Sequence, residues 1–447
     1  MMKRILTRKV IQCLKSMMVL AMIYLMNYPF SGALLAQNHA GLKKIWTELA
    51  IENEYHVGLS IYDLSKEKWI FNHREDNYFT PASNVKLLTM LATLTYLDEK
   101  IPAAFYQEKE DTLFIWGGGD PGTLYPPVRD SAGLVDFIRN TNKQIVFSEK
   151  HFEAERFGSG WAWDDFKYNY QAERTAYPVY GNRLWVERRD DTVSITPEYF
   201  QPVFNIQKDT TDKLSRNEWG TKYLYQYTYG KKSDKLSIPV SLFKSDIRGI
   251  WKEITGKDIS WVDVPIPNST QKINGTPRDT LLKIMMQQSD NFIAEQLLLS
   301  CALKMTGKML EEEFIERMLK GPLADIPDKI SWVDGSGLSR YNLMTPRSTL
   351  FVLDKLIRLK GLDYMKSILP AGGQSGTIID WYESPNGTPY LYAKTGTLSN
   401  ASALTGILIT KSDRVILFSW MHNQFTKNTA VIKSNMQKLF TWIRDNY

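Results

Sequence analysis

The sequence predicts an α+β fold in which both ends of the chain build one sheet, helices lie between its strands, and a large, mostly β segment is inserted. Strand-like runs occur early, at V-G-L-S-I-Y-D-L and W-I-F-N, and again near the end, at P-Y-L-Y-A-K-T-G-T-L, S-A-L-T-G-I-L-I-T and R-V-I-L-F-S-W. Helical periodicity fills residues 81–97, 278–289 and 291–299. Between about 98 and 270, short aromatic-rich β-like runs alternate with polar turns. We therefore predict a domain of residues 37–98 and 271–447, interrupted at 99–270 by one or two mostly β domains.

Residues 1–36 are predicted to be a signal peptide. They hold five basic residues and no acidic one, followed by a short apolar run at 17–26 and small residues near the end, at Ser31, Gly32, Ala33 and Ala36. An uncleaved membrane anchor is the alternative, but the apolar run is about half the length of a spanning helix. We predict an exported, periplasmic protein that meets a membrane only through this segment if it stays uncleaved.

The C-terminal run at 429–443 is an amphipathic helix. It could lie on a membrane surface; packing on the sheet is the preferred interpretation.

Composition excludes several classes of function. Five of the six net positive charges lie in residues 1–36, so the rest of the chain gives no case for a nucleic-acid partner. Only Cys301 lies outside the predicted signal, so no intrachain disulfide is expected. The five histidines are scattered, without metal-ligand spacing. We predict no metal and no cofactor.

The spacing S-x-x-K, typical of a serine nucleophile with a lysine base, occurs four times, at Ser65–Lys68, Ser83–Lys86, Ser241–Lys244 and Ser269–Lys272. The first and last lie in polar turns or loops, and Ser241 is better explained as a helix cap. Ser83 differs, because Thr80 can cap a helix and Pro81 can begin it, which places Ser83 in the first turn. Lys86 then shares its face, and the apolar residues behind would desolvate the lysine and lower its pKa.

Two further motifs follow in order. Ser289-Asp290-Asn291 lies at a break between two helical runs, and Lys394-Thr395-Gly396 lies in a strand. The combination of S-x-x-K, S-D-N and K-T-G is found in β-lactamases and penicillin-binding proteins.

With these motifs, the chain resembles the D-alanyl-D-alanine carboxypeptidase/endopeptidases of peptidase family S13, the low-molecular-mass class C penicillin-binding proteins. The similar segments span nearly the whole chain after the signal: F-T-P-A-S-N-V-K-L-L-T, G-G-G-D-P-G-T, G-W-A-W-D-D, Q-S-D-N-F-I-A-E-Q-L-L, D-G-S-G-L-S-R-Y-N-L-M-T-P and A-K-T-G-T-L-S-N-A-S-A-L-T-G. The resemblance implies a penicillin-binding/β-lactamase-like transpeptidase fold, an antiparallel sheet flanked by helices, with a large insertion between Ser83 and Ser289.

The resemblance also implies a mechanism. Ser83 attacks the carbonyl carbon of a D-Ala-D-Ala peptide, with Lys86 as general base. Ser289 relays a proton to the leaving amine, and Asn291 holds Lys86 and the substrate backbone. Peptidoglycan stem peptides would be the substrates, and penicillins and other β-lactam antibiotics would acylate the same serine.

Residues of the K-T-G strand are implied to bind substrate. Lys394 supplies positive charge near the substrate carboxylate, and the Thr395 hydroxyl binds that carboxylate. The backbone N–H groups of Ser83 and Thr397 form the oxyanion hole. A side chain at Gly396 would obstruct a peptide lying along the strand.

The family also has a pocket for the side chain of the stem peptide. Leu338, Arg340, Leu398 and Asp164 match its elements, since an arginine suits a carboxylate and an aspartate suits an ammonium group. The run W-A-W-D-D leaves Asp164 and Asp165 as alternatives. Nearby aromatic residues could stack on sugar or belong to the core of the insertion: Trp161, Trp163, Tyr168 and Tyr170.

Two competing functions are open at this point. A β-lactamase or esterase on the same fold is one, although no E-x-x-x-N lies between S-D-N and K-T-G to supply a deacylating glutamate. A non-catalytic peptidoglycan-binding scaffold is the other, and the intact motif residues argue against it.

Overall fold

The computed structural model describes the chain except residues 1–39, 50–55, 129–132, 191, 229–232 and 427. The predicted signal peptide, 1–36, lies outside the described residues. A five-stranded antiparallel sheet has the order β14-β15-β16-β1-β2. Its strands are β14 (Leu391–Leu398), β15 (Ala401–Ile409), β16 (Val415–Asn423), β1 (His56–Asp63) and β2 (Lys68–His73). Because β1 pairs with β16, the two ends of the chain form one sheet, as predicted.

One face of this sheet is covered by terminal helices. The C-terminal helix α10 (Thr429–Asn446) and a helix at residues 40–48 share a core with the sheet. Phe440 of α10 packs on Phe418 and Trp420 of β16, with ring centroids 4.2 and 5.6 Å apart. The predicted packing of the C-terminal helix on the sheet is therefore confirmed. Among the described residues, no helix is long and apolar enough to cross a membrane.

The other face of the sheet meets a helical layer. Ile407 and Leu417 point into this layer, while their neighbours Leu408 and Phe418 point the opposite way, as strand alternation requires. The helices are α2 (Lys86–Tyr96), α5 (Arg278–Gln287), α6 (Asn291–Thr306), α7 (Glu311–Lys320), α8 (Pro346–Lys360) and α9 (Leu362–Ile368).

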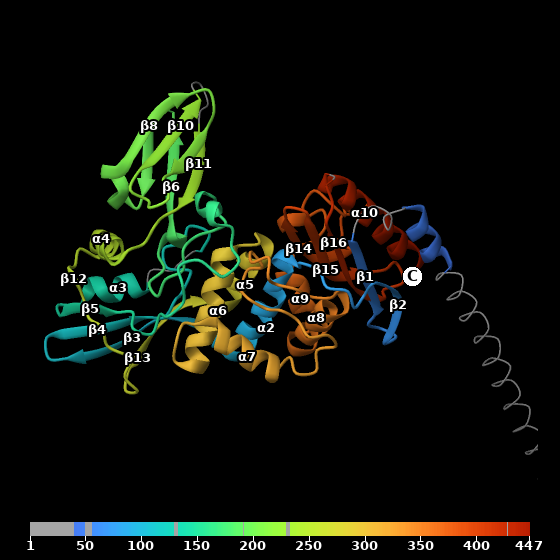
Figure 1. The fold of residues 1–447 in the computed structure, drawn as a ribbon, viewed down its shortest axis with the longest axis horizontal. Helices are drawn as coiled ribbons and strands as arrows, with labels where there is room; N and C mark the ends of the chain where they lie inside the picture. Colours follow the sequence, from blue (N-terminus) through green and yellow to red (C-terminus); the bar gives the residue numbers. More distant parts are fainter. Residues whose placement is uncertain (1–39, 50–55, 129–132, 191, 229–232, 427) are drawn as a thin grey trace, which may run out of the picture.

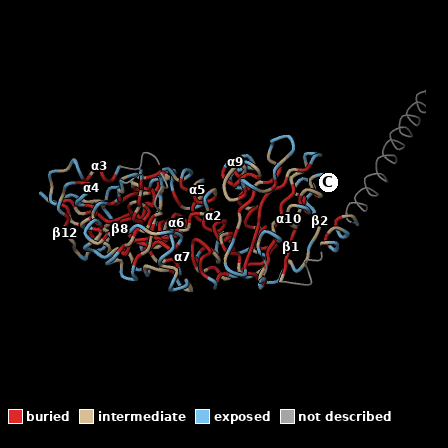
Figure 2. The backbone as a smooth tube through the Cα atoms, turned by 90° about the horizontal axis from the view of Figure 1, so that it is seen from above, coloured by how far each residue is buried: buried red, intermediate tan, exposed pale blue. Residues whose placement is uncertain are grey.

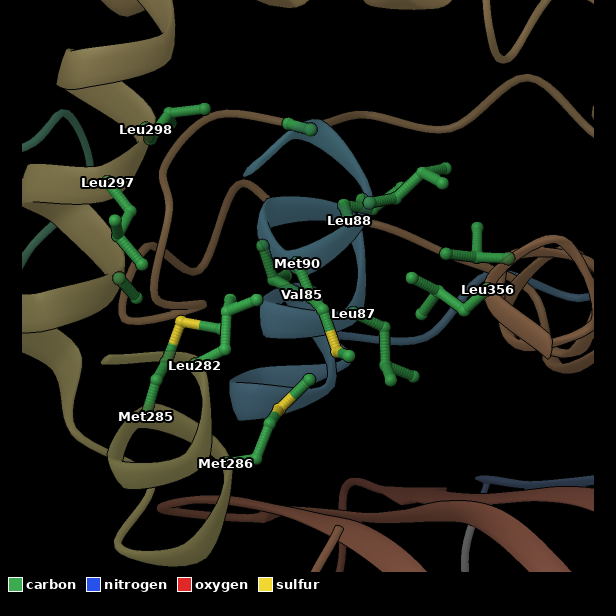
Figure 3. Packing of buried hydrophobic residues seen from close by; sticks show 14 of the residues in the cluster. Val85, Leu87, Leu88, Met90, Leu282, Met285, Met286, Leu297, Leu298 and Leu356 are labelled. Atoms are coloured by element: carbon green, nitrogen blue, oxygen red, sulfur yellow. The ribbon is translucent and has the colours of Figure 1, made fainter. Parts of the chain in front are cut away.

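Helix α2 lies at the centre of the helical layer. Its apolar side chains meet α5, α6 and α8, and Figure 3 shows Leu87 and Met90 between Met286 and Leu356. In the view of Figure 2 the buried backbone runs through α2 and α6 as well as β1 and α10. Helix α2 is thus held rigidly from several sides, and it begins directly after the turn that contains Ser83.

The first module of the insertion is a mixed sheet of order β12-β5-β4-β3-β13. Its strands are β12 (Ile259–Trp261), β5 (Gln144–Ser148), β4 (Thr112–Gly117), β3 (Lys100–Lys109) and β13 (Gln271–Pro277). Two helices share its core, α3 (Gly133–Asn140), which was not predicted, and α4 (Lys244–Thr255), which was predicted as a helical run opening at Ser241. The domain boundaries placed at 98/99 and 270/271 stay predictions; β13 completes this sheet and leads directly into α5.

The second module of the insertion has two small sheets around one core, and it stands apart from the terminal sheet in Figure 1. One sheet is β11-β6-β7 and the other is β8-β10-β9. The strands are β6 (Arg183–Arg189), β7 (Thr192–Thr196), β8 (Phe204–Asp209), β9 (Lys213–Arg216), β10 (Tyr223–Thr228) and β11 (Ser233–Pro239).

One local prediction in the insertion is wrong. Ser241 does not cap a helix, because α4 begins at Lys244 with Phe243 as its N-cap. The Ser241 hydroxyl instead donates to Glu173 and accepts from Arg216 inside a buried polar cluster. The Ser241 hydroxyl therefore bonds buried charged side chains, not the N-terminus of a helix.

Candidate active site

Ser83 lies in a tight turn that precedes α2. The turn is the 3-10 helix η2 (Ala82–Val85), with Pro81 at its N-cap and no side-chain cap, so the predicted capping by Thr80 is wrong. Ala82 has φ +47°, a conformation that L-residues adopt at a cost. This backbone fixes Ser83 at the start of a buried helix.

Two glycines let other segments approach this turn. A Cβ on Gly396 of β14 would lie 2.5 Å from the Pro81 carbonyl oxygen and 3.1 Å from the Ser83 nitrogen. A Cβ on Gly337, at φ +82°, would overlap the carbonyl oxygen of Ala82. Gly396 was expected to leave room for substrate, but the structure gives a different reason. The glycine allows β14 to pack against the turn that carries Ser83.

Lys86 is fully buried and contacts three motifs. Its Nζ donates to Ser83 Oγ at 3.0 Å, to Asn291 Oδ1 at 2.7 Å and to the Ser336 carbonyl oxygen at 2.7 Å. Desolvation lowers the pKa of Lys86 to about 8, and the negative charges of Asp334, Glu295 and Asp290 oppose that decrease. A substantial fraction of Lys86 is therefore neutral just above neutral pH and able to accept the serine proton.

The S-D-N motif forms the start of α6. Asp290 caps the helix by accepting from the Ile293 N–H, and Asn291 is the first helical residue. Ser289 precedes them at φ +56°. The amide of Asn291 accepts from Lys86 through Oδ1 and donates through Nδ2 to the Tyr170 carbonyl at 3.0 Å. The motif thereby connects the general-base candidate to the insertion.

Lys394 projects from β14 toward the S-D-N motif. Its Nζ donates to Ser289 Oγ at 2.8 Å and to the Thr395 carbonyl at 2.7 Å. The side chain is fully buried, and desolvation together with the nearby Lys86 holds its pKa well below the ordinary lysine value. The structure therefore brings five predicted residues into one constellation of two hydrogen-bonded groups, one of Ser83, Lys86 and Asn291 and one of Ser289 and Lys394.

A cavity of about 430 Å³ opens over this constellation. Of the predicted binding residues, Leu338, Arg340, Thr397 and Leu398 line it, together with Ser83, Ser289 and Asn291. Thr395 and Gly396 do not belong to the lining. The Thr395 hydroxyl instead donates to Thr377 Oγ1 at 2.7 Å, so its predicted role in carboxylate binding has no support from this arrangement.

The acidic residue of the cavity is Asp165 rather than Asp164, which corrects the choice made from W-A-W-D-D. Asp164 turns outward on the 3-10 helix η3 (Trp163–Lys167), with its carboxylate 3.6 Å from Lys167 Nζ. Asp165 hydrogen-bonds the Tyr170 hydroxyl, which also lines the cavity, and burial raises the pKa of Tyr170. Consecutive residues of a helix face different directions, so the sequence alone could not select between them.

The aromatic residues of this segment are not core residues of the insertion. Trp163 is 76% exposed, and Tyr168 and Tyr170, whose rings stack at 5.4 Å, are 46% and 38% exposed. Trp161 is intermediate and donates to Asp334 at 3.0 Å.

Sequence reasoning missed the buried acids behind Lys86. Glu295 accepts from the Ser336 N–H at 2.7 Å, and Asp334 accepts from Gly337, Ser339 and Asn342. Arg174 of the insertion lies 3.5 Å from Glu295. The signal was present: Glu295 is a single acid in the otherwise uncharged, largely apolar run F-I-A-E-Q-L-L-L, where a buried carboxylate requires partners.

The family model of the "D-Ala-D-Ala carboxypeptidase 3 (S13) family" matches residues 39–225 and 266–445, most of the chain. The chain belongs to this family. The family predicted from the motifs is therefore confirmed, and so is the predicted class of enzyme, a serine D,D-peptidase.

Relatives and solved structures agree with membership of the S13 family. The D-alanyl-D-alanine carboxypeptidase DacB of Haemophilus influenzae is 22% identical over 441 residues, which cover 88% of this chain and 90% of that protein. The crystal structure of penicillin binding protein 4 (dacB) from Haemophilus influenzae has a TM-score of 0.71 at 19% identity, covering 91% of this chain and 99% of that one. The same protein complexed with a β-lactam has a TM-score of 0.65 at 18% identity, with equal coverage. These likenesses confirm the predicted penicillin-binding fold.

Proposed function

We propose that this S13 enzyme hydrolyses D-Ala-terminated peptide bonds of peptidoglycan through an acyl-enzyme on Ser83. One observation carries the proposal: Ser83 Oγ lies 3.0 Å from the Nζ of a fully buried Lys86 whose pKa is lowered to about 8. The buried amine of Lys86 can act as the base and the Ser83 hydroxyl as the nucleophile, and the rigid start of the helix fixes their relative position.

Acylation follows from this geometry. The neutral Lys86 takes the Ser83 proton as Oγ bonds to the substrate carbonyl carbon, and the backbone N–H groups of Ser83 and Thr397 donate to the oxyanion. The C–N bond then breaks, Ser289 passes its proton to the leaving amine, and the proton held by Lys86 replaces it on Ser289. In the second half of the reaction water attacks the ester and gives one proton, through Lys86, to Ser83 Oγ, and the acid is released.

Lys394 is proposed to respond to the substrate carboxylate. Burial and the charge of the nearby Lys86 both lower the pKa of Lys394 in the free enzyme. A substrate carboxylate would raise this pKa, so binding would favour proton uptake by Lys394.

β-Lactams would occupy the same cavity and acylate Ser83, since their amide carbonyl and carboxylate resemble those of the substrate. The side-chain pocket of Leu338, Arg340, Leu398 and Asp165 would receive the residue before the D-Ala pair. An exported, periplasmic location, proposed from residues 1–36, places the enzyme with this substrate.

The test measures D-Ala release from a muramyl pentapeptide and cleavage of a cross-linked muropeptide dimer. We expect Ser83→Ala to abolish both activities and covalent labelling by fluorescent penicillin, while Ser269→Ala, an exposed serine with the same S-x-x-K spacing, retains them. Unchanged activity in Ser83→Ala would refute the proposal. Rapid turnover of penicillin by the wild type, with neither peptide product, would identify a β-lactamase.

A further inference from the structure

A second cavity, of about 500 Å³, adjoins the active site. It shares Tyr170, Ser289 and Asn291 with the first cavity, but its lining includes neither Ser83 nor any residue of β14. Its volume is within the range of small-molecule pockets, about 300–1,000 Å³. The two cavities therefore meet at Ser289, and only the first contains the nucleophile.

The second module of the insertion forms the outer wall of this second cavity. Trp185 of β6 and residues 235–237 of β11 line it, and β6 and β11 pair there with Trp185 opposite Ser237. The Nζ of Lys235, an exposed residue, lies 6.0 Å from the centroid of the Trp185 ring. Both strands belong to the module that stands apart in Figure 1, so this wall is the part of the module that reaches the catalytic residues.

The cavity carries a net positive charge. Asp290 and Arg183 both line it, but their charges offset each other, with Arg183 Nη2 3.6 Å from Asp290 Oδ2 and the Tyr125 hydroxyl bonded to both side chains. Lys235 then adds a second positive charge to the lining. Glu187, opposite Lys235 on β6, interacts electrostatically with it, but Glu187 is hydrogen-bonded to Arg189 at 2.9 Å on the exposed surface and does not line the cavity.

The proposed function sets the direction in which substrate runs, and the inference rests on it. The acyl part of the substrate extends from Ser83 toward Leu338, Arg340 and Leu398, all in the first cavity. The leaving amine takes its proton from Ser289, where the second cavity begins. A chain attached to that amine thus continues away from the acyl pocket into the second cavity. A leaving D-Ala ends near Ser289, whereas the leaving half of a cross-link is a whole stem peptide bearing carboxylates.

We propose that the second cavity binds the stem peptide on the leaving-group side of a peptidoglycan cross-link. Lys235 attracts a carboxylate of that peptide, and Trp185 packs on its aliphatic part. The inserted module thereby gives the enzyme an endopeptidase site, which cleavage of a terminal D-Ala does not use.

The test compares kcat/KM on a cross-linked muropeptide dimer with kcat/KM on the pentapeptide monomer. Lys235→Gln should lower dimer cleavage about threefold and Lys235→Glu about tenfold, as expected for loss and reversal of one partly exposed charge contact. D-Ala release from the monomer should stay within about twofold. Raising the salt concentration should slow dimer cleavage by the wild type more than by Lys235→Gln.

Lys213→Glu is the matched control, because Lys213 is an exposed lysine of β9 in the same module and does not line the cavity. It should change neither activity. Equal losses on both substrates in Lys235→Glu, or no loss on the dimer, would overturn the inference. Those outcomes are distinct from failure of the proposed function, which would appear as activity that survives Ser83→Ala.

Discussion

The surroundings of Lys86 and of Lys394 differ, although both side chains are fully buried in one site and interact electrostatically. Three carboxylates, those of Asp334, Glu295 and Asp290, raise the pKa of Lys86 against the effect of desolvation. No carboxylate in the described part of the chain offsets the effect of desolvation on Lys394, and the neighbouring Lys86 lowers its pKa further. Two equally buried lysines thus differ in pKa. The pKa of Lys86 is about 8, whereas that of Lys394 is lowered without an opposing carboxylate and would rise if a substrate anion bound.

This difference in pKa distinguishes a general base, Lys86, from a substrate-binding group, Lys394. A base needs a neutral form at working pH and enough basicity to accept a proton, which a pKa of about 8 provides. A positively charged group binds a carboxylate more strongly in a desolvated site, because water screens their attraction less there. The following substitutions test whether the two lysines divide the work in this way.

The largest effect is expected from Lys86→Met. Loss of the general base should lower kcat/KM for D-Ala release by about 10³–10⁴-fold and prevent labelling by fluorescent penicillin. The free energy of unfolding at pH 7 should not decrease, because the desolvation cost of this ammonium group is present below pH 8 and disappears only as the pH rises from 8 toward the unfolded value of 10.5. Chemical denaturation provides that measurement, and retained labelling would contradict the role of Lys86.

A smaller loss, about 10²–10³-fold in kcat/KM, is expected from Lys394→Met, because this variant removes charge stabilisation and the contact with Ser289 but leaves the base in place. Penicillin should still label Ser83 slowly. Proton uptake on binding a carboxylate-bearing substrate, measured by calorimetry in buffers of different ionisation enthalpy, should decrease. Losses equal to those of Lys86→Met would show that the lysines act as one unit.

The smallest effect on rate is expected from Glu295→Gln, which removes one of the charges that distinguish the two lysines. The Lys86 pKa should fall, so the midpoint of the pH dependence of kcat/KM should move below about 8. Glu311→Gln is the control, because Glu311 also pairs with Arg174, at 2.6 Å, but does not bond the Ser336 segment that contacts Lys86. An unchanged midpoint in Glu295→Gln would assign Glu295 a purely structural role.

Much of the fold was predictable because its signals are local. The strands of the terminal sheet carry largely apolar runs bounded by turn residues, and α2 and α6 carry broad apolar faces. Helix α3 was not predicted, since its eight residues make only about two turns, and α4 was predicted only as a helical run opening at Ser241. The predictions that Thr80 and Ser241 cap helices are wrong. The turn at Ser83 has no side-chain cap, and the Ser241 hydroxyl bonds Glu173, a tertiary contact that a local pattern does not reveal.

The sequence by itself determined the reactive groups, their order and the family, because S-x-x-K, S-D-N and K-T-G are short motifs whose residue types are dictated by chemistry. Only the tertiary structure decided which acid lines the cavity at Ser83, Asp165 rather than Asp164, and why Gly396 must lack a side chain. It also decided the balance of charges around Lys86 and the meeting of β6 and β11 with Ser289. These properties depend on distances between residues far apart in the chain, and desolvation and Coulomb energy act through space rather than along the sequence.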